Sequence, residues 1–196
     1  MRIAVVGASG GTGAQAVARA LGHGHEVTAL ARDVAGIQAT GERLRPAAAD
    51  VRDLQSMPSL LPGHDSVLVA IGAKPARQVD LYSAGISNVV YAMAESGVAR
   101  LVVVSAAGAF HRDDPNLSLG YKMMVRTVLR GLYDDLERME QRVMASALEW
   151  VVVRPAGLTD GPLTGEYRIG RDGRPLGEGG RISRADVGAF MVKAAE

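Results

Sequence analysis

Residues 2–13 read R-I-A-V-V-G-A-S-G-G-T-G, and this stretch decides the fold. Its first five residues form a short run rich in valine and isoleucine, which is typical of a buried parallel strand. Gly7, Gly10 and Gly13 follow at a spacing of three. Apolar residues then recur at helical intervals, at Ala14, Val17, Ala18 and Leu21. A strand, a glycine turn and a helix in this order predict a βα unit.

The glycine spacing, G-x-x-G-x-x-G, favours a loop that binds phosphate groups. One glycine allows a tight turn, a second lets the backbone approach a pyrophosphate, and a third lets the helix pack on the strand. The free N–H groups at the helix start point at the anion, and two hydroxyl groups add donors. A purely structural tight turn is the alternative. We expect a nucleotide cofactor on Gly7, Ser9, Gly10, Gly11, Thr12 and Gly13.

Length and composition are those of an ordinary globular chain. Its 196 residues suffice for one α/β domain, and 47% are hydrophobic and 22% charged. The net charge of +1 provides no field that would favour nucleic acid or an anionic membrane. The absence of cysteine excludes disulfides and thiolate chemistry. No apolar run reaches the roughly 18 residues of a membrane span, and the N-terminus leads directly into a core strand, so we expect a cytoplasmic protein with no signal peptide. We also expect no metal site.

The residue after the second expected strand, residues 26–31, bears on the choice of cofactor. An acidic residue there would bind the ribose 2′-hydroxyl of NAD. Arg32 stands there instead, and a guanidinium can pair with a 2′-phosphate. The sequence therefore favours NADP(H) over NAD(H), with a solvated arginine as the alternative. Asp33 is interpreted as the N-cap of a short helical stretch, and His23 and His25 as exposed turn residues.

The rest of the chain continues to alternate between strands and helices. Further strands are expected at residues 45–49, 66–72, 100–105 and 150–155. Helical stretches are expected around Leu54, Met57 and Leu60, over 80–97, over 119–147 with a possible interruption at Gly131, and after the N-cap Ser183 with Asp186. This alternation predicts right-handed crossovers and a doubly wound parallel sheet of the Rossmann type, flanked by helices.

Two segments are interpreted more simply. The charged string D-D-L-E-R-M-E-Q-R, residues 134–142, is expected to form a solvated helix face. Residues 156–180 are rich in glycine and are expected to form loops with at most a short strand at 167–169.

The chain resembles the atypical short-chain dehydrogenase/reductase group with NmrA-like NAD(P)H-binding domains. Within this group it is most similar to the flavin reductase, or biliverdin-IXβ reductase, branch. The resemblance covers almost the whole chain and implies one domain over residues 1–196, with acceptor-site loops at about 106–118 and 156–180. It is carried by residues 7–13, 31–33, 49–51, 63–72 and 102–105, by W-V-V-V-R-P (150–155), and most specifically by G-P-L-T-G-E-Y (161–167) and R-I-S-R-A-D-V-G-A-F-M (181–191).

The resemblance also implies a role for each matched position along the cofactor. Residues 7–13 would hold the pyrophosphate and Arg32 the 2′-phosphate. The positions implied further along are Asp50 and Val51 beside the adenine, Ile71 and Gly72 under the adenosine ribose, Ser105 and Ala106 near the nicotinamide, and Arg154 and Pro155 beside it.

The chain departs from typical short-chain dehydrogenases in its proton chemistry. Those enzymes use a tyrosine as general acid, with a lysine four residues on that lowers its pKa. Here Val125 stands four residues after Tyr121, so that mechanism is not supported. The flavin reductase branch lacks the pair too, but it carries a histidine after the sixth strand, where this chain has R-P-A-G-L. Ser105 is then the candidate catalytic residue, with Phe110 and His111 as candidates for the acceptor site.

These observations favour an NADPH-dependent reductase that transfers hydride to a flat conjugated acceptor, such as a flavin, a linear tetrapyrrole or a quinone. The protein would supply position and electrostatics for such a small-molecule acceptor. A second hypothesis is an NmrA-like NADP(H) sensor without catalysis. A third, a sugar-nucleotide epimerase, is disfavoured by the short substrate region. A monomer and a homodimer both remain open.

Overall fold

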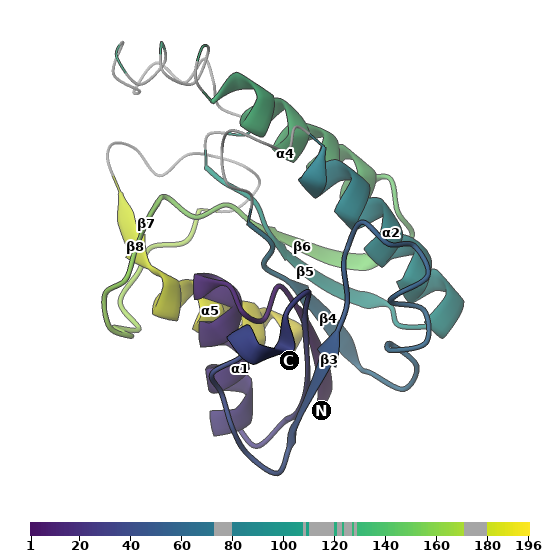
Figure 1. The fold of residues 1–196 in the computed structure, drawn as a ribbon. Coiled ribbons are helices and arrows are strands. Elements are labelled where there is room, and N and C mark those ends of the chain that lie inside the picture. Colours follow the sequence, from purple (N-terminus) through teal and green to yellow (C-terminus); the bar gives the residue numbers. More distant parts are fainter. Residues whose placement is uncertain are drawn as a thin grey trace.

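The computed structural model describes residues 1–72, 80–107, 109, 120, 123, 127, 129–170 and 180–196. Its centre is a six-stranded parallel sheet with the strand order β3-β2-β1-β4-β5-β6 (Figure 1). The winding direction reverses between β1 and β4, which is the arrangement of a doubly wound nucleotide-binding sheet. The strands are β1 (Arg2–Val6), β2 (Glu26–Ala31), β3 (Leu44–Ala48), β4 (Ser66–Val69), β5 (Arg100–Val104) and β6 (Glu149–Val153).

Helices cover both faces of this sheet, so the predicted doubly wound α/β fold is confirmed. Helices α2 and α4 pack on one face, and α1 and α5 pack on the other (Figure 1). Outside the large sheet, a short 3-10 helix, η1 (Val34–Gly36), follows β2, and the strands β7 (Gly157–Thr159) and β8 (Arg181–Ser183) form a separate pair. The helices are α1 (Gly11–Gly22), α2 (Leu81–Ser96), α4 (Arg130–Met144) and α5 (Arg184–Ala195).

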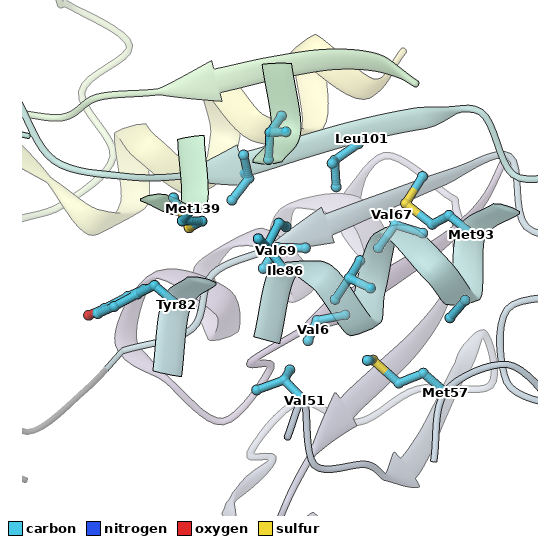
Figure 2. Packing of buried hydrophobic residues seen from close by; sticks show 14 of the residues in the cluster. Val6, Val51, Met57, Val67, Val69, Tyr82, Ile86, Met93, Leu101 and Met139 are labelled. Carbon is cyan, nitrogen blue, oxygen red and sulfur yellow. The ribbon is translucent and has the colours of Figure 1, made fainter. Parts of the chain in front are cut away.

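Each central strand supplies both hydrophobic cores, because alternate side chains point to opposite faces of a sheet. In β1, Ala4 and Val6 belong to the core under α2 and α4, whereas Ile3 and Val5 belong to the core under α1 and α5. Figure 2 shows the first core from close by, with strand residues meeting helix residues across the layer. The fully buried residues labelled there include Val67, Val69, Leu101, Ile86, Met93 and Met139.

The expected helix around Leu54, Met57 and Leu60 is wrong, because residues 51–63 form turns. The carboxylates of Asp50 and Asp53 accept hydrogen bonds from the amides two residues ahead, at 3.0 Å each. Such bonds offer the backbone an alternative to a helix. Prolines at 58 and 62 add to this effect, since proline disfavours the helical conformation in the residue before it. Met57 is nevertheless fully buried, as its apolar character predicts.

Two further expectations are corrected. The expected helical pair over 119–147 has its break at Leu129, a bend between the helical residues 127 and 130, and not at Gly131, which is the second residue of α4. The expected strand at 167–169 is absent from the described residues, and β7 pairs with β8 instead. The amides of Thr164 and Gly165 donate to the Asp186 carboxylate at 2.9 Å and 2.8 Å. These bonds hold the loop that follows β7 against the start of α5. The residues that precede this loop form β7, which pairs with β8. The predicted N-cap is confirmed, since Ser183 accepts the Asp186 amide.

The charged string at 134–142 is not simply a solvated face, because two of its carboxylates are fully buried. Asp135 accepts hydrogen bonds from the amides of Tyr82 and Ser83, at 2.8 Å and 3.3 Å. These amides belong to the first turn of α2, whose own N-cap, Asp80, makes no side-chain capping bond. A carboxylate of α4 therefore caps α2 and fixes the two helices relative to each other.

This cap predicts a stability effect. Replacing Asp135 by alanine leaves buried N–H groups without an acceptor, which costs about 1–3 kcal/mol of unfolding free energy. Denaturant unfolding measures the difference, and Asp135→Asn, which keeps one acceptor oxygen, should lose less. Glu95→Ala, at an exposed position of α2, is the matched control. Equal stability of Asp135→Ala and the wild type would contradict the capping role.

Candidate functional site

The glycine loop is tied to the sheet by its backbone. Gly7 has a left-handed φ of +85°, which favours glycine. The amides of Gly7 and Ala8 both donate to the carbonyl of Leu30 in β2, at 2.9 Å and 3.0 Å. A Cβ on Gly7 would lie 2.5 Å from the carbonyl oxygen of Ala70, which follows β4. The loop is thus packed between β2 and the end of β4, and its first glycine has no room for a side chain.

The other two glycines of the motif play different structural parts. A Cβ on Gly13 would lie 2.1 Å from the Gly7 carbonyl oxygen, so the start of α1 touches the loop backbone directly. A Cβ on Gly10 would lie 3.2 Å from the same oxygen, which is far less severe. Gly10 is the N-cap of α1 and has no side chain with which to cap it. The first N–H groups of α1 are therefore available to an anion.

A cavity of about 290 Å³ opens beside this helix start. It is bounded by the glycine loop, by the segment that follows β2, and by the loop after β7 together with the start of α5. In Figure 1, α1 and α5 lie side by side under the sheet, which brings these chain segments together. Residues that line the cavity include Ser9, Gly10, Gly11, Gly36, Gln38 and Arg184.

Arg184 is a site residue that the sequence analysis missed. A Cβ on Gly11 would lie 2.7 Å from its Cδ and 3.0 Å from its Nε, so the side chain runs across the glycine loop. Its Nη1 donates to the exposed Asp160 carboxylate at 2.6 Å. Arg184 is also the first residue of α5, where the helix dipole disfavours a cation. That unfavourable placement, visible in R-I-S-R-A-D, is the signal that could have identified it.

Arg32 lies exposed directly after β2, as the sequence predicts. Within the part of the chain that the structure describes, its guanidinium has no hydrogen-bond or ion-pair partner. Asp33 is confirmed as an N-cap, because its carboxylate accepts the Ala35 amide of η1 at 3.0 Å. Asp33 is therefore occupied locally, whereas the neighbouring Arg32 is available for an anion.

The candidate adenosine residues follow the carboxyl ends of β3 and β4. Val51 is buried, and its carbonyl accepts a hydrogen bond from Asn88 at 2.8 Å. A Cβ on Gly85 of α2 would lie 3.0 Å from Val51 Cγ2 and 3.3 Å from Ile71 Cδ1. Val51 and Ile71 thus pack on α2. The structure therefore brings them together, with their neighbours Asp50 and Gly72, at the edge where the sequence predicts the adenosine half.

Ser105 belongs to a buried polar cluster at the ends of β5 and β6. Its Oγ donates to the carboxylate of Glu140, a fully buried residue of α4. Arg154 follows β6, and its Nε donates to the same carboxylate at 2.9 Å to Oε2 and 3.1 Å to Oε1. The sequence analysis placed Glu140 on a solvated face, and the structure corrects this. The charge of Arg154 makes burial of the carboxylate tolerable.

The remaining predicted residues are only partly placed. Ala106 and Pro155 lie beside Ser105 and Arg154, and the Pro155 carbonyl accepts the Ala107 amide at 3.0 Å. Phe110 and His111 lie outside the described residues, as does most of the expected acceptor loop at 106–118. In the described parts of the chain, no helix is both long and apolar enough to span a bilayer.

The sheet order, the glycine loop and the free start of α1 define a dinucleotide-binding, Rossmann-type protein. The pattern of the NAD(P)H-binding family matches residues 7–196, and the chain belongs to this family.

Two proteins with related sequences cover different shares of their own length. An uncharacterized protein of Mycobacterium tuberculosis is 33% identical over 156 residues, which are 80% of this chain and 15% of that protein. The chain therefore spans only a small part of this longer relative. The protein YwnB of Bacillus subtilis is 26% identical over 176 residues, which are 88% of this chain and 80% of YwnB.

Solved structures share the fold at low sequence identity. The oxidoreductase ylbE from Lactococcus lactis aligns over 98% of this chain and 84% of its own, with a TM-score of 0.81 and 17% identity. The anaerobillin reductase ChuY from Escherichia coli O157:H7 aligns over 100% and 90%, with a TM-score of 0.77 and 22% identity. A short-chain dehydrogenase/reductase from Veillonella parvula, in complex with NADP, aligns over 97% and 84%, with a TM-score of 0.79 and 16% identity.

The geometry of the loop predicts that substitutions of Gly10 and Gly13 affect different properties, cofactor binding and stability. Gly10→Val should keep the fold, because Gly10 already has an extended backbone (φ −80°, ψ 158°). The new side chain would block the approach of a pyrophosphate and abolish NADP(H) binding. Gly13→Ala should instead unfold or markedly destabilise the protein, because its Cβ meets backbone.

Thermal melting and a cofactor titration separate the two effects. Gly22→Ala is the control, since a Cβ there meets no described atom within 4 Å. Retained cofactor affinity in Gly10→Val would show that the loop is only a turn.

Proposed function

We propose that this protein is an NADPH-dependent reductase that transfers hydride to a flat conjugated acceptor. The observation that carries the proposal is the buried Ser105–Glu140–Arg154 cluster at the end of β5 and β6, on the same sheet edge as the glycine loop. The loop and Arg32 suit the phosphate groups of the cofactor, and the cluster suits its nicotinamide end.

The preference for NADP(H) rests on Arg32. The adjoining cavity is bounded by Gly36 and Gln38, which belong to the segment that follows Arg32 in the chain. A guanidinium can form a bidentate, charge-assisted contact with such a phosphate. Arg184 is assigned to the pyrophosphate, because it crosses Gly11 at the start of α1. Its present partner, Asp160, is exposed and can release it to water.

The hydrogen bond from Ser105 to Glu140 limits how the Ser105 hydroxyl can interact with a ligand. Because its proton is donated to Glu140, its oxygen can act toward a ligand only as an acceptor. The carboxamide N–H of a nicotinamide, or a ring N–H of an acceptor, is a suitable donor. Glu140 is then a positioning residue that orients Ser105 and Arg154 together. The bound reduced nicotinamide supplies the hydride.

The acceptor is assigned by class. A flat ring system that stacks on a nicotinamide needs little side-chain chemistry, which suits a flavin, a linear tetrapyrrole or a quinone. The fold neighbour ChuY is a reductase of a tetrapyrrole, which supports this class. We assign the acceptor site to the loops at 106–118 and 156–180, with Phe110 covering the ring and His111 as a proton donor.

One observation favours a second candidate, an NADP(H) sensor without turnover. The hydroxyl proton of Ser105 and the charge of Arg154 are both engaged by Glu140. A site whose polar groups already hydrogen-bond to one another can bind a cofactor even if none of these groups takes part in a reaction. Measured turnover decides between the two candidates.

The two arginines should differ in which cofactor they affect. Arg32→Ala should weaken NADPH by about 10- to 100-fold, the loss of a charge-assisted contact of roughly 1.5–3 kcal/mol, and leave NADH unchanged. Arg184→Ala should weaken both cofactors by similar factors, because both carry the pyrophosphate. Calorimetry on the two variants and the wild type measures this. Equal wild-type affinity for NADPH and NADH would contradict the assignment of Arg32.

Turnover with NADPH and FMN, FAD or a quinone tests the reductase itself. Ser105→Ala should reduce turnover a few-fold to about tenfold, since it removes one positioning hydrogen bond of roughly 0.5–1.5 kcal/mol. Affinity for 2′,5′-ADP should stay unchanged, because Ser105 lies away from the adenosine half. Ser96→Ala in α2 is the control. Tight NADPH binding without turnover of any acceptor would establish the sensor instead.

A further inference from the structure

Two histidines and a glutamate converge at the edge of the sheet opposite the cofactor edge. His23 is the C-cap residue of α1, and His25 directly precedes β2. Gly24 between them has a left-handed φ of +81°, which folds the two residues into a tight turn. Glu196 follows the last turn of α5. Figure 1 shows the two chain ends close together beside α1 and α5.

The three side chains point their ligand atoms at one place. His23 Nδ1 lies 2.9 Å from Glu196 Oε1, and His25 Nε2 lies 2.8 Å from the same oxygen. One nitrogen from each histidine and one carboxylate oxygen all lie within 4.8 Å of one another. The imidazole ring centres are 6.0 Å apart with planes tilted by 59°, so the rings do not stack on each other.

Exposure and charge also suit a ligand. The His25 side chain is only 12% exposed, so the expectation of two exposed turn residues is wrong for His25, whereas His23 and Glu196 are 33% and 35% exposed. Hydrogen bonds from His23 and His25 hold the pKa of the Glu196 carboxyl below its usual range. The group is therefore a carboxylate at neutral pH, half-open to water.

We propose that His23, His25 and Glu196 bind one divalent first-row transition-metal ion, for which Zn²⁺ is the probe. Two imidazole nitrogens and one carboxylate oxygen are a recurrent zinc donor set that leaves a fourth position for water. Tetrahedral ligands at about 2.0–2.1 Å from the metal lie roughly 3.3 Å apart. The two nitrogen–oxygen distances must therefore lengthen by about half an ångström, which rotation of the half-exposed Glu196 side chain provides.

The site is independent of the cofactor. It lies at the amino ends of β1 and β2, where Arg2 pairs with Glu26, whereas the glycine loop follows the carboxyl end of β1. A bound ion would link the turn between α1 and β2 to the end of α5. Because binding to the folded state alone stabilises it, the ion would act as a clasp between these elements.

The charged group that faces this cluster sets the conditions of the test. The amino group of Met1 lies 3.4 Å from Nδ1 of His25, the ring nitrogen that faces away from the ion. A pH of 8 is chosen for the test because metal ligands bind in their deprotonated form, so that binding competes with protons at lower pH.

Calorimetric titration of the untagged, EDTA-treated full chain with ZnCl₂ at pH 8 tests the proposal. One equivalent should bind to the wild type. Affinity should fall at least by the roughly 10- to 100-fold typical of weakened metal shells in His23→Ala, His25→Ala and Glu196→Gln. Glu95→Gln, at an exposed position of α2, should bind as the wild type does. Zinc should also raise the melting temperature of the wild type but not of His23→Ala.

Two results would overturn the proposal. One is the absence of one-to-one binding by the wild type, which would leave only a hydrogen-bonded cluster. The other is unchanged affinity in both His23→Ala and Glu196→Gln, which would place the ion elsewhere. Should His25→Ala fail to fold, these two variants at more exposed positions still decide the question.

Discussion

The start of α1 lies so close to the end of β1 that no side chain fits between them. The Cβ that Gly13 lacks would be 2.1 Å from the Gly7 carbonyl oxygen, far closer than a non-bonded carbon and oxygen can approach. This contact fixes where the helix begins and therefore where its N–H groups point. Because the amides of Gly7 and Ala8 share the Leu30 carbonyl, the same contact also fixes the loop relative to β2 and the residues that follow it.

Interactions along one element were predictable from the sequence. The strand at residues 26–31 was predicted with its observed bounds, because short runs of buried β-branched and apolar residues between glycines have few other interpretations. The predicted helix at 80–97 matches α2 within a residue at each end, since Gly97 takes the left-handed conformation that ends a helix. The cap of Ser183 on Asp186 is likewise a local pattern.

Interactions between distant elements were not predictable in the same way. Glu140 belongs to a charged run that resembles a solvated face, and only the packing of α4 against β5 and β6 reveals its partners. Arg184 reaches Gly11 because α5 lies beside α1, although the two residues are far apart in the chain. The turns at 51–63 were missed because two aspartate side chains compete for backbone amides that an apolar spacing assigned to a helix.

Two buried carboxylates fix the relative positions of elements that apolar contacts alone would not fix. Asp135 of α4 supplies the missing cap of α2, and Asp186 of α5 holds two amides of the glycine-rich loop before it. Apolar contact is non-directional, whereas each of these hydrogen bonds accepts only one arrangement of its partners. These hydrogen bonds therefore fix the position of α4 relative to α2, and that of the glycine-rich loop relative to α5.

The burial of Glu140 restricts how this protein can change over generations. A substitution that removes Arg154 alone takes the opposite charge away from a fully buried carboxylate, and one that removes Glu140 alone takes that carboxylate away from Arg154 and Ser105. A protein with either single substitution is therefore expected to be less stable than the original protein or one in which both residues are replaced. Descendants should therefore keep both residues or lose both together, so positions 140 and 154 are expected to vary as a pair across related sequences, with position 105 following them.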